Sequence, residues 1–149
     1  MIIEFARRGG AKKYPTADLK KIAAAILATL EQEQTELSIV LVGDKEMRPL
    51  NLKYRKKNKT TDVLSFPADE SMPLGSVLLG DVIISLEQAR RQARERNKSL
   101  KSEMATLLTH GILHLLGYDH ERSPRQAKIM AKLERKLFSH LCEEGLIKV

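Results

Sequence analysis

Residues 104–120, MATLLTHGILHLLGYDH, hold three of the four histidines of this 149-residue chain. Apolar side chains cover residues 104–116 on almost all sides of a helical projection, a pattern typical of a buried helix. Gly117 follows directly, and glycine readily takes the left-handed conformation found at helix C-termini. The stretch predicts a buried helix that ends at Gly117, followed by a turn that carries the third histidine.

The spacing of these histidines is that of a metal site. His110 and His114 stand four residues apart, so a helix places them one turn apart on the same face. The turn after Gly117 lets His120 approach from a different direction. Burying imidazoles without partners is costly, and a metal ion satisfies them. We expect His110, His114 and His120 to bind one metal ion and to leave its fourth tetrahedral position open.

The ligand set favours zinc in an open rather than a closed site. Closed structural zinc sites usually contain cysteines and four protein ligands, whereas this chain has one cysteine, Cys142, far along the sequence. Zn²⁺ is the expected cofactor for three imidazoles, although nickel, cobalt and copper also bind this donor.

The same spacing matches the metzincin protease pattern H-E-x-x-H-x-x-G-x-x-H, with one departure. Gly111 stands where the protease has its glutamate, the general base beside the metal-bound water. The metal ligands of a protease are therefore present without its base. A zinc-dependent peptidase or amidase remains an alternative, and the sequence does not identify another proton acceptor.

The length of the chain favours one domain spanning residues 1–149. Its composition favours a reducing compartment. No apolar run is long enough to span a membrane, and the N-terminus lacks the order of a signal peptide. A single cysteine excludes an intramolecular disulfide. We therefore expect a cytoplasmic protein with no membrane partner.

The order of the elements predicts an α/β (α+β) fold, with a single mixed sheet of about four strands packed with helices. Pro49 disturbs the helix expected after Gly43, which either starts at Asp44 or begins near Arg48 with Pro49 in its first turn. Gly80-Asp81 is expected to interrupt the last strand. The expected strands are 1–6, 37–42, 63–66 and 77–84; the expected helices are 16–32, 44–54, 85–96, 99–116 and 124–142; and a loop is expected over 68–76.

Positive charge is concentrated in two runs. Residues 53–59 carry five cations and no acid, and residues 90–101 carry six cations and one acid. Such runs attract polyphosphate backbones, but they also serve as ordinary solvated surfaces. Beside a metal site, either run is a candidate contact for nucleic acid.

Three segments resemble the YbeY family of bacterial metal-dependent endoribonucleases. The first is the metal segment, residues 110–120; the second is LNLKYR at 50–55 with TDVLSFP at 61–67; the third is LGDVIIS at 79–85. The resemblance spans the chain in length and motif order. Asn58 and Thr60 depart from the family pattern, which has an acid and a proline there in many members.

The resemblance implies an α/β fold with a mixed sheet and zinc on His110, His114 and His120. It further implies cleavage of single-stranded RNA, maturation of the 3′ end of small-subunit ribosomal RNA and a part in ribosome quality control. It also places a functionally important arginine at Arg55. Ribosomal RNA and small-subunit components are then the expected partners, and DNA is not expected to be one.

Phosphate chemistry gives Arg55 a specific task. Phosphodiester cleavage builds charge on non-bridging oxygens, which a guanidinium clamps bidentately. We expect Arg55 to be catalytic, and Lys53, Arg55, Lys56 and Lys57 to contact RNA. Asp119 either orients a ligand or caps the turn before His120. A zinc-containing, ribosome-associated binding factor without catalysis is the remaining alternative.

Overall fold

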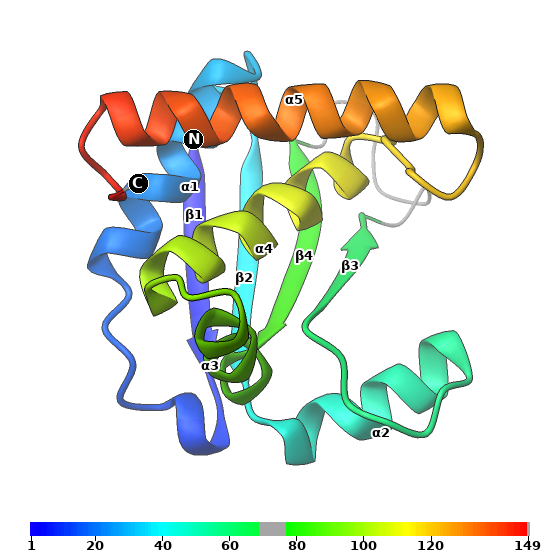
Figure 1. The fold of residues 1–149 in the computed structure, drawn as a ribbon. Helices are drawn as coiled ribbons and strands as arrows, with labels where there is room; N and C mark the ends of the chain where they lie inside the picture. Colours follow the sequence, from blue (N-terminus) through cyan, green and yellow to red (C-terminus); the bar gives the residue numbers. More distant parts are fainter. Residues whose placement is uncertain (69–76, 149) are drawn as a thin grey trace.

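The computed structural model describes residues 1–68 and 77–148, in which four strands form one mixed sheet (Figure 1). Its spatial order is β1-β2-β4-β3. Strands β1, β2 and β4 run parallel, and β3 pairs antiparallel with β4. The bounds are β1 Ile2–Arg7, β2 Glu36–Val42, β3 Val63–Pro67 and β4 Leu78–Ser85. This confirms the predicted mixed four-stranded sheet.

Alternating side chains divide the sheet into a large core face and a smaller one. Leu37, Ile39 and Leu41 of β2 are buried in the main core together with Val82 and Ile84 of β4. Three helices pack on this face, α1 (Ala17–Thr29), α3 (Leu86–Glu95) and α4 (Leu100–Leu115), and α5 (Pro124–Glu143) packs on α4 and α1 within the same core. A second cluster, Val42, Met47 and Leu64, lies where α2 (Asp44–Arg55) packs on the sheet. Side chains alternate between the two faces of a strand, so those of β2 enter the large core and the small cluster in turn.

Helix α4 crosses the large face of the sheet and forms the centre of the fold (Figure 1). The Ser99 hydroxyl accepts a hydrogen bond from the Ser102 N–H and caps its start. At its end Gly117 takes φ +96°, and the Tyr118 N–H bonds to the Leu113 carbonyl at 3.1 Å. Together with the bond from the Gly117 N–H to the His114 carbonyl at 3.0 Å, this contact forms a Schellman motif, so the predicted helix and its glycine stop are both confirmed.

Helix α2 begins at Asp44, so a start near Arg48 is the wrong alternative. Its N-terminus is held by two carboxylates: Glu46 accepts from the Gly43 N–H, and Glu87 of α3 accepts from the Asp44 N–H. Pro49 removes only one intrahelical N–H donor, and these caps satisfy donors that an isolated helix would leave free.

Strand β4 runs continuously through Gly80-Asp81, which corrects the predicted interruption. The register against β2 shifts at this point: Glu36 pairs with Leu78 and Leu37 with Gly80, which leaves one extra residue on β4. The irregularity is absorbed as a bulge that keeps the ladder intact. The loop predicted over 68–76 lies almost entirely outside the described residues.

The longest helix, α5, is amphipathic rather than apolar throughout. The Ser123 hydroxyl caps its start by accepting a hydrogen bond from the Gln126 N–H. The helix lies along the end of the sheet at which the parallel strands begin (Figure 1). Within residues 1–68 and 77–148, no helix combines the length and apolarity needed to cross a bilayer. The cytoplasmic location stays a prediction.

Candidate metal centre and cleft

The three predicted histidines converge at the C-terminal end of α4. His110 and His114 share one face of the helix, and their Nε2 atoms lie 3.1 Å apart. The ring of His120, beyond Gly117, lies 5.3 Å from that of His110 and 5.7 Å from that of His114, centroid to centroid. One ring nitrogen from each lies within 4.8 Å of the others. The fold therefore brings the whole candidate ligand set together.

The arrangement fits a divalent metal. Two nitrogens bound tetrahedrally at zinc–nitrogen distances of 2.0–2.1 Å stand about 3.3 Å apart. The 3.1 Å separation between His110 and His114 is close to that value. Burial lowers the pKa of His114, and the neighbouring imidazoles of His110 and His120 lower it further, against the opposing effect of the Asp119 carboxylate. A lowered pKa favours the neutral imidazole, which is the form that binds metal.

The histidines line an open cleft of about 570 Å³. Its other walls are the end of α2, with Tyr54 and Arg55, the length of β3, and the turn that carries Asp119 and Glu121. The Ser65 hydroxyl of β3 donates to the Gly111 carbonyl at 3.1 Å, which fixes the strand against the metal helix. The cleft therefore juxtaposes a candidate metal site and a guanidinium.

Gly111 packs closely against strands β3 and β4 of the sheet. A Cβ placed on it would lie 2.7 Å from Val82 Cγ1 and 3.2 Å from Ser65 Oγ. A glutamate side chain cannot be accommodated there unless the helix moves away from β4. The missing protease base thus has a packing reason: this position faces the sheet rather than the cleft.

Replacing Gly111 with alanine should destabilise the protein by about 1–3 kcal/mol, because the added methyl overpacks the interface with Val82. Helix propensity alone would change stability in the opposite direction by about 1 kcal/mol. Equilibrium chemical denaturation measures the difference. Gly10→Ala is the control, because no other atom lies within 4 Å of a Cβ at that position. Equal or greater stability of Gly111→Ala would contradict the close-packing account.

The first basic run straddles the end of α2, and its members have different surroundings. Arg55 lines the cleft, whereas Lys53 places its ammonium 5.2 Å from the centre of the Tyr54 ring. Lys56 ends the helix in the left-handed conformation, and Lys57 follows it in the exposed turn. None of these four cations forms an ion pair with a residue that the structure describes.

The second basic run is largely engaged within the fold. Arg96 and Lys98 bind the carboxylate of Glu103, which is fully buried on α4, at 2.6 and 3.4 Å. Arg91 pairs with Asp44 at 2.7 Å, and its guanidinium holds the pKa of that carboxyl below its usual value. Of the two basic runs, the first is therefore the better candidate for nucleic acid.

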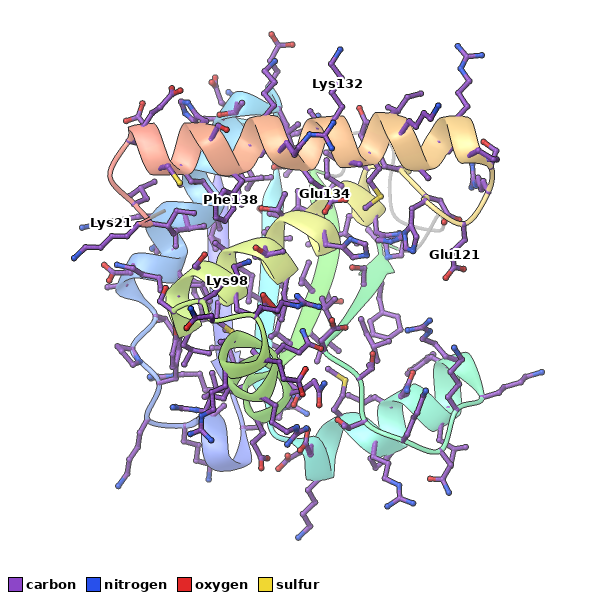
Figure 2. The ribbon with its side chains drawn as sticks, in the orientation of Figure 1. Lys21, Lys98, Glu121, Lys132, Glu134 and Phe138 are labelled. Atoms are coloured by element: carbon purple, nitrogen blue, oxygen red, sulfur yellow. The ribbon has the colours of Figure 1, made fainter. Side chains whose placement is uncertain are left out.

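Two acidic side chains complete the surroundings of the histidines. The Asp119 carboxylate accepts from the Glu121 N–H at 2.9 Å, a contact that caps the turn, as one of the two predicted roles requires. Glu134 on α5 points toward the end of α4, and its Oε1 lies 3.9 Å from His110 Nδ1 (Figure 2). Sequence reasoning missed Glu134, because nothing in the helical pattern of α5 shows which turn packs over His110.

Comparison with known proteins identifies the family. The family model described as Endoribonuclease YbeY matches residues 5–142. Proteins named Endoribonuclease YbeY from Myxococcus xanthus and Sulfurihydrogenibium are 54% and 50% identical to this chain, each over 84% of it. The matches cover 42% and 83% of those relatives, so the chain spans less than half of the Myxococcus protein. The Geobacter metallireducens relative is 41% identical over 99% of this chain and 100% of its own.

A solved structure agrees with this assignment. The solution structure of a Thermotoga maritima protein superposes with a TM-score of 0.68 at 28% identity, and the match covers 97% of this chain and 91% of that one. The sequence resemblance, the matched family model and the shared fold agree over nearly the whole length. The chain belongs to the YbeY endoribonuclease family.

Proposed function

We propose that this protein is a metal-dependent endoribonuclease that hydrolyses phosphodiester bonds in single-stranded RNA. The observation that carries the proposal is the cleft in which His110, His114 and His120 converge and which Arg55 also lines. The substrate we propose is ribosomal RNA, in maturation of the small-subunit 3′ end and in ribosome quality control, with small-subunit components as partners. The name shared by its relatives, Endoribonuclease YbeY, supports the reaction class.

The three imidazoles would hold one Zn²⁺ ion, which supplies Lewis acidity toward a water molecule or a phosphoryl oxygen when bound. Arg55 binds the non-bridging oxygens of the scissile phosphate and neutralises the charge that develops on them. Lys53, Lys56 and Lys57 attract the RNA backbone toward the cleft. The Ser65 contact with Gly111 holds β3, one wall of the cleft, in a fixed position against the metal helix.

Two alternative functions make different demands on the same site. A peptidase needs a carboxylate base, and Gly111 has no space for one. A non-catalytic ribosome-binding factor needs no open cleft beside its metal, whereas here a cleft of about 570 Å³ opens onto all three histidines. The geometry therefore favours hydrolysis of a phosphodiester.

The reaction class is tested by offering metal-loaded protein three substrates in parallel: single-stranded RNA, the same RNA as a duplex, and an unstructured peptide. We expect cleavage of the single strand alone, and loss of cleavage on chelation. Cleavage of the peptide without the RNA would identify a peptidase. Binding of RNA without cleavage at full metal occupancy would identify the non-catalytic factor.

We further propose that Glu134 orients His110. A carboxylate facing Nδ1 keeps the proton on that nitrogen and leaves the Nε2 lone pair for the metal. The 3.9 Å separation is closed by a small side-chain rotation or by a bridging water. Glu134 is a positioning residue in this account, because it acts through His110.

Glu134→Gln should weaken metal affinity by about 10- to 100-fold, the range typical for partners of metal-bound histidines. Competition with a chromophoric chelator measures this affinity without any activity assay. Glu121→Gln is a matched control, because Glu121 Oε1 also lies 3.9 Å from a histidine nitrogen, but its side chain is 72% exposed and lies at the edge of the molecule (Figure 2). Equal losses in the two variants would mean that general charge, not orientation, sets the affinity.

A further inference from the structure

A half-exposed aromatic side chain stands at the mouth of the metal cleft. Tyr54, on the last turn of α2, is 53% exposed, although tyrosine buries a large apolar ring in most folds. Its ring meets Phe66 of β3 at a centroid distance of 4.6 Å and an angle of 60°. Both rings line the cleft that contains the three histidines. Two consecutive elements, α2 and β3, thus build one aromatic corner beside the candidate metal.

Packing within the fold does not account for Tyr54. The small core beneath α2 consists of Val42, Met47 and Leu64, with Phe66 among the partly buried residues packed against it. Tyr54 is not part of that cluster. It contacts Phe66 from outside the core and leaves the rest of its ring to solvent, so its exposed surface is available to a ligand.

The charges around the ring indicate the chemistry of that ligand. The Lys53 ammonium lies 5.2 Å from the centre of the Tyr54 ring, and Arg55, the next residue, lines the same cleft. A cation-flanked aromatic face is the combination with which proteins bind single-stranded nucleic acid: cations follow the backbone and rings stack on bases. An uncharged, apolar ligand would gain nothing from these cations.

We propose that Tyr54 and Phe66 form a stacking platform for one unpaired base of the RNA, adjacent to the phosphate that Arg55 binds. The inference deepens the proposed function and rests on it. A base in a duplex is stacked between its neighbours and paired, so it cannot reach the platform without disruption of the helix. The platform therefore supplies a physical reason for preferring single strands, which the metal and Arg55 alone do not.

The test is the affinity of the metal-loaded, 149-residue chain for 2′-O-methyl hexauridylate, an oligomer that keeps bases and phosphates while resisting ribonucleases. Fluorescence anisotropy of an end-labelled oligomer gives the Kd. Tyr54→Ala should weaken binding by about 5- to 150-fold, the range for loss of one base–aromatic stack. Tyr54→Phe keeps the ring and should bind like the wild type. Leu52→Ala is the matched control, because Leu52 is 47% exposed on the same helix and does not line the cleft.

An oligomer of the same length without bases separates stacking from charge. Wild type and Tyr54→Ala should bind it equally, because no base is present to stack. Tyrosine fluorescence adds a readout that does not depend on Tyr54→Ala being folded. The chain has three tyrosines and no tryptophan, so its intrinsic emission comes from tyrosine. Stacking of a base on Tyr54 should therefore quench the emission of the wild type more than that of Tyr54→Phe.

The outcomes distinguish this proposal from the proposed function. Failure of wild-type protein to bind or cleave single-stranded RNA would overturn the endoribonuclease assignment itself. Tight wild-type binding that Tyr54→Ala retains, or equal quenching in wild type and Tyr54→Phe, would overturn the platform and leave the nuclease assignment standing.

Discussion

Replacing His114 with alanine should lower the rate of RNA cleavage by more than about 100-fold, beyond the 10- to 100-fold loss typical for residues that only support a metal ligand. The loss is expected because two histidines remain and no longer define a tetrahedral site. The fold should persist, because His114 is only partly buried and faces the cleft, whereas the apolar side chains of α4 form the core. Metal content and cleavage should fall together.

The fourth histidine provides the control for this variant. His140 lies on α5 outside the site, with Glu144 at 3.9 Å as its partner. His140→Ala should keep both metal and activity. Thermal unfolding of the metal-free proteins separates a catalytic from a structural ion: loss of folded structure in His114→Ala, rather than loss of cleavage, would identify a structural site and contradict the account.

Replacing Arg55 with alanine should lower kcat by about 100-fold, the effect typical of removing one preorganised donor to a developing oxyanion. Arg55 is the one cation of residues 53–59 that lines the cleft with the histidines. Arg55→Lys retains the charge but cannot form the bidentate contact, so it should recover little of the loss. Steady-state kinetics on single-stranded RNA, at fixed metal occupancy, separates kcat from KM.

Lys57→Ala is the contrasting variant, because Lys57 lies in the exposed turn after α2 and does not line the cleft. It should raise KM, leave kcat unchanged and reduce the dependence of log Kd on log salt concentration by about 0.7, the value for one contact to a single-stranded phosphate. If Arg55→Ala showed the same pattern, Arg55 would be an RNA-binding residue with no role in the chemical step.

The parts of the site that sequence predicted are local. His110 and His114 follow from a four-residue helical spacing, and the return of His120 follows from the glycine stop at Gly117, both within one short segment. The YbeY motifs then added Arg55. The histidine predictions depend on residues near one another in the chain, where helix and turn geometry suffice. Arg55 came from the family resemblance, because local geometry does not show that the end of one helix reaches a cleft beside another.

The parts that sequence missed depend on long-range packing. Glu134 reaches His110 only because α5 lies over the end of α4, and Tyr54 meets Phe66 only because α2 returns beside β3. The helical pattern of α5 indicates an apolar face but not which acid on its border approaches a ligand. The alternative helix start near Arg48, which Pro49 suggested, was wrong for a related reason. The Glu87 carboxylate that caps α2 at Asp44 comes from another helix, and the sequence does not show that contact.

Gly111 illustrates how the structure changes the meaning of a correct sequence observation. The sequence shows that a protease base is missing there. The structure adds that Val82 occupies the space any side chain would need. The same residue thus argues against peptide hydrolysis and explains how α4 lies close enough to β4 and β3 for the histidines to reach the cleft.

The central claim is that one ion on His110, His114 and His120 supports RNA hydrolysis. Its most direct test is a zinc titration of metal-free protein during which cleavage of single-stranded RNA is measured at each step. The account predicts negligible cleavage without metal and a linear rise that saturates at one equivalent in the wild type, with no rise in His114→Ala over the same range. Undiminished cleavage by the metal-free protein would contradict it.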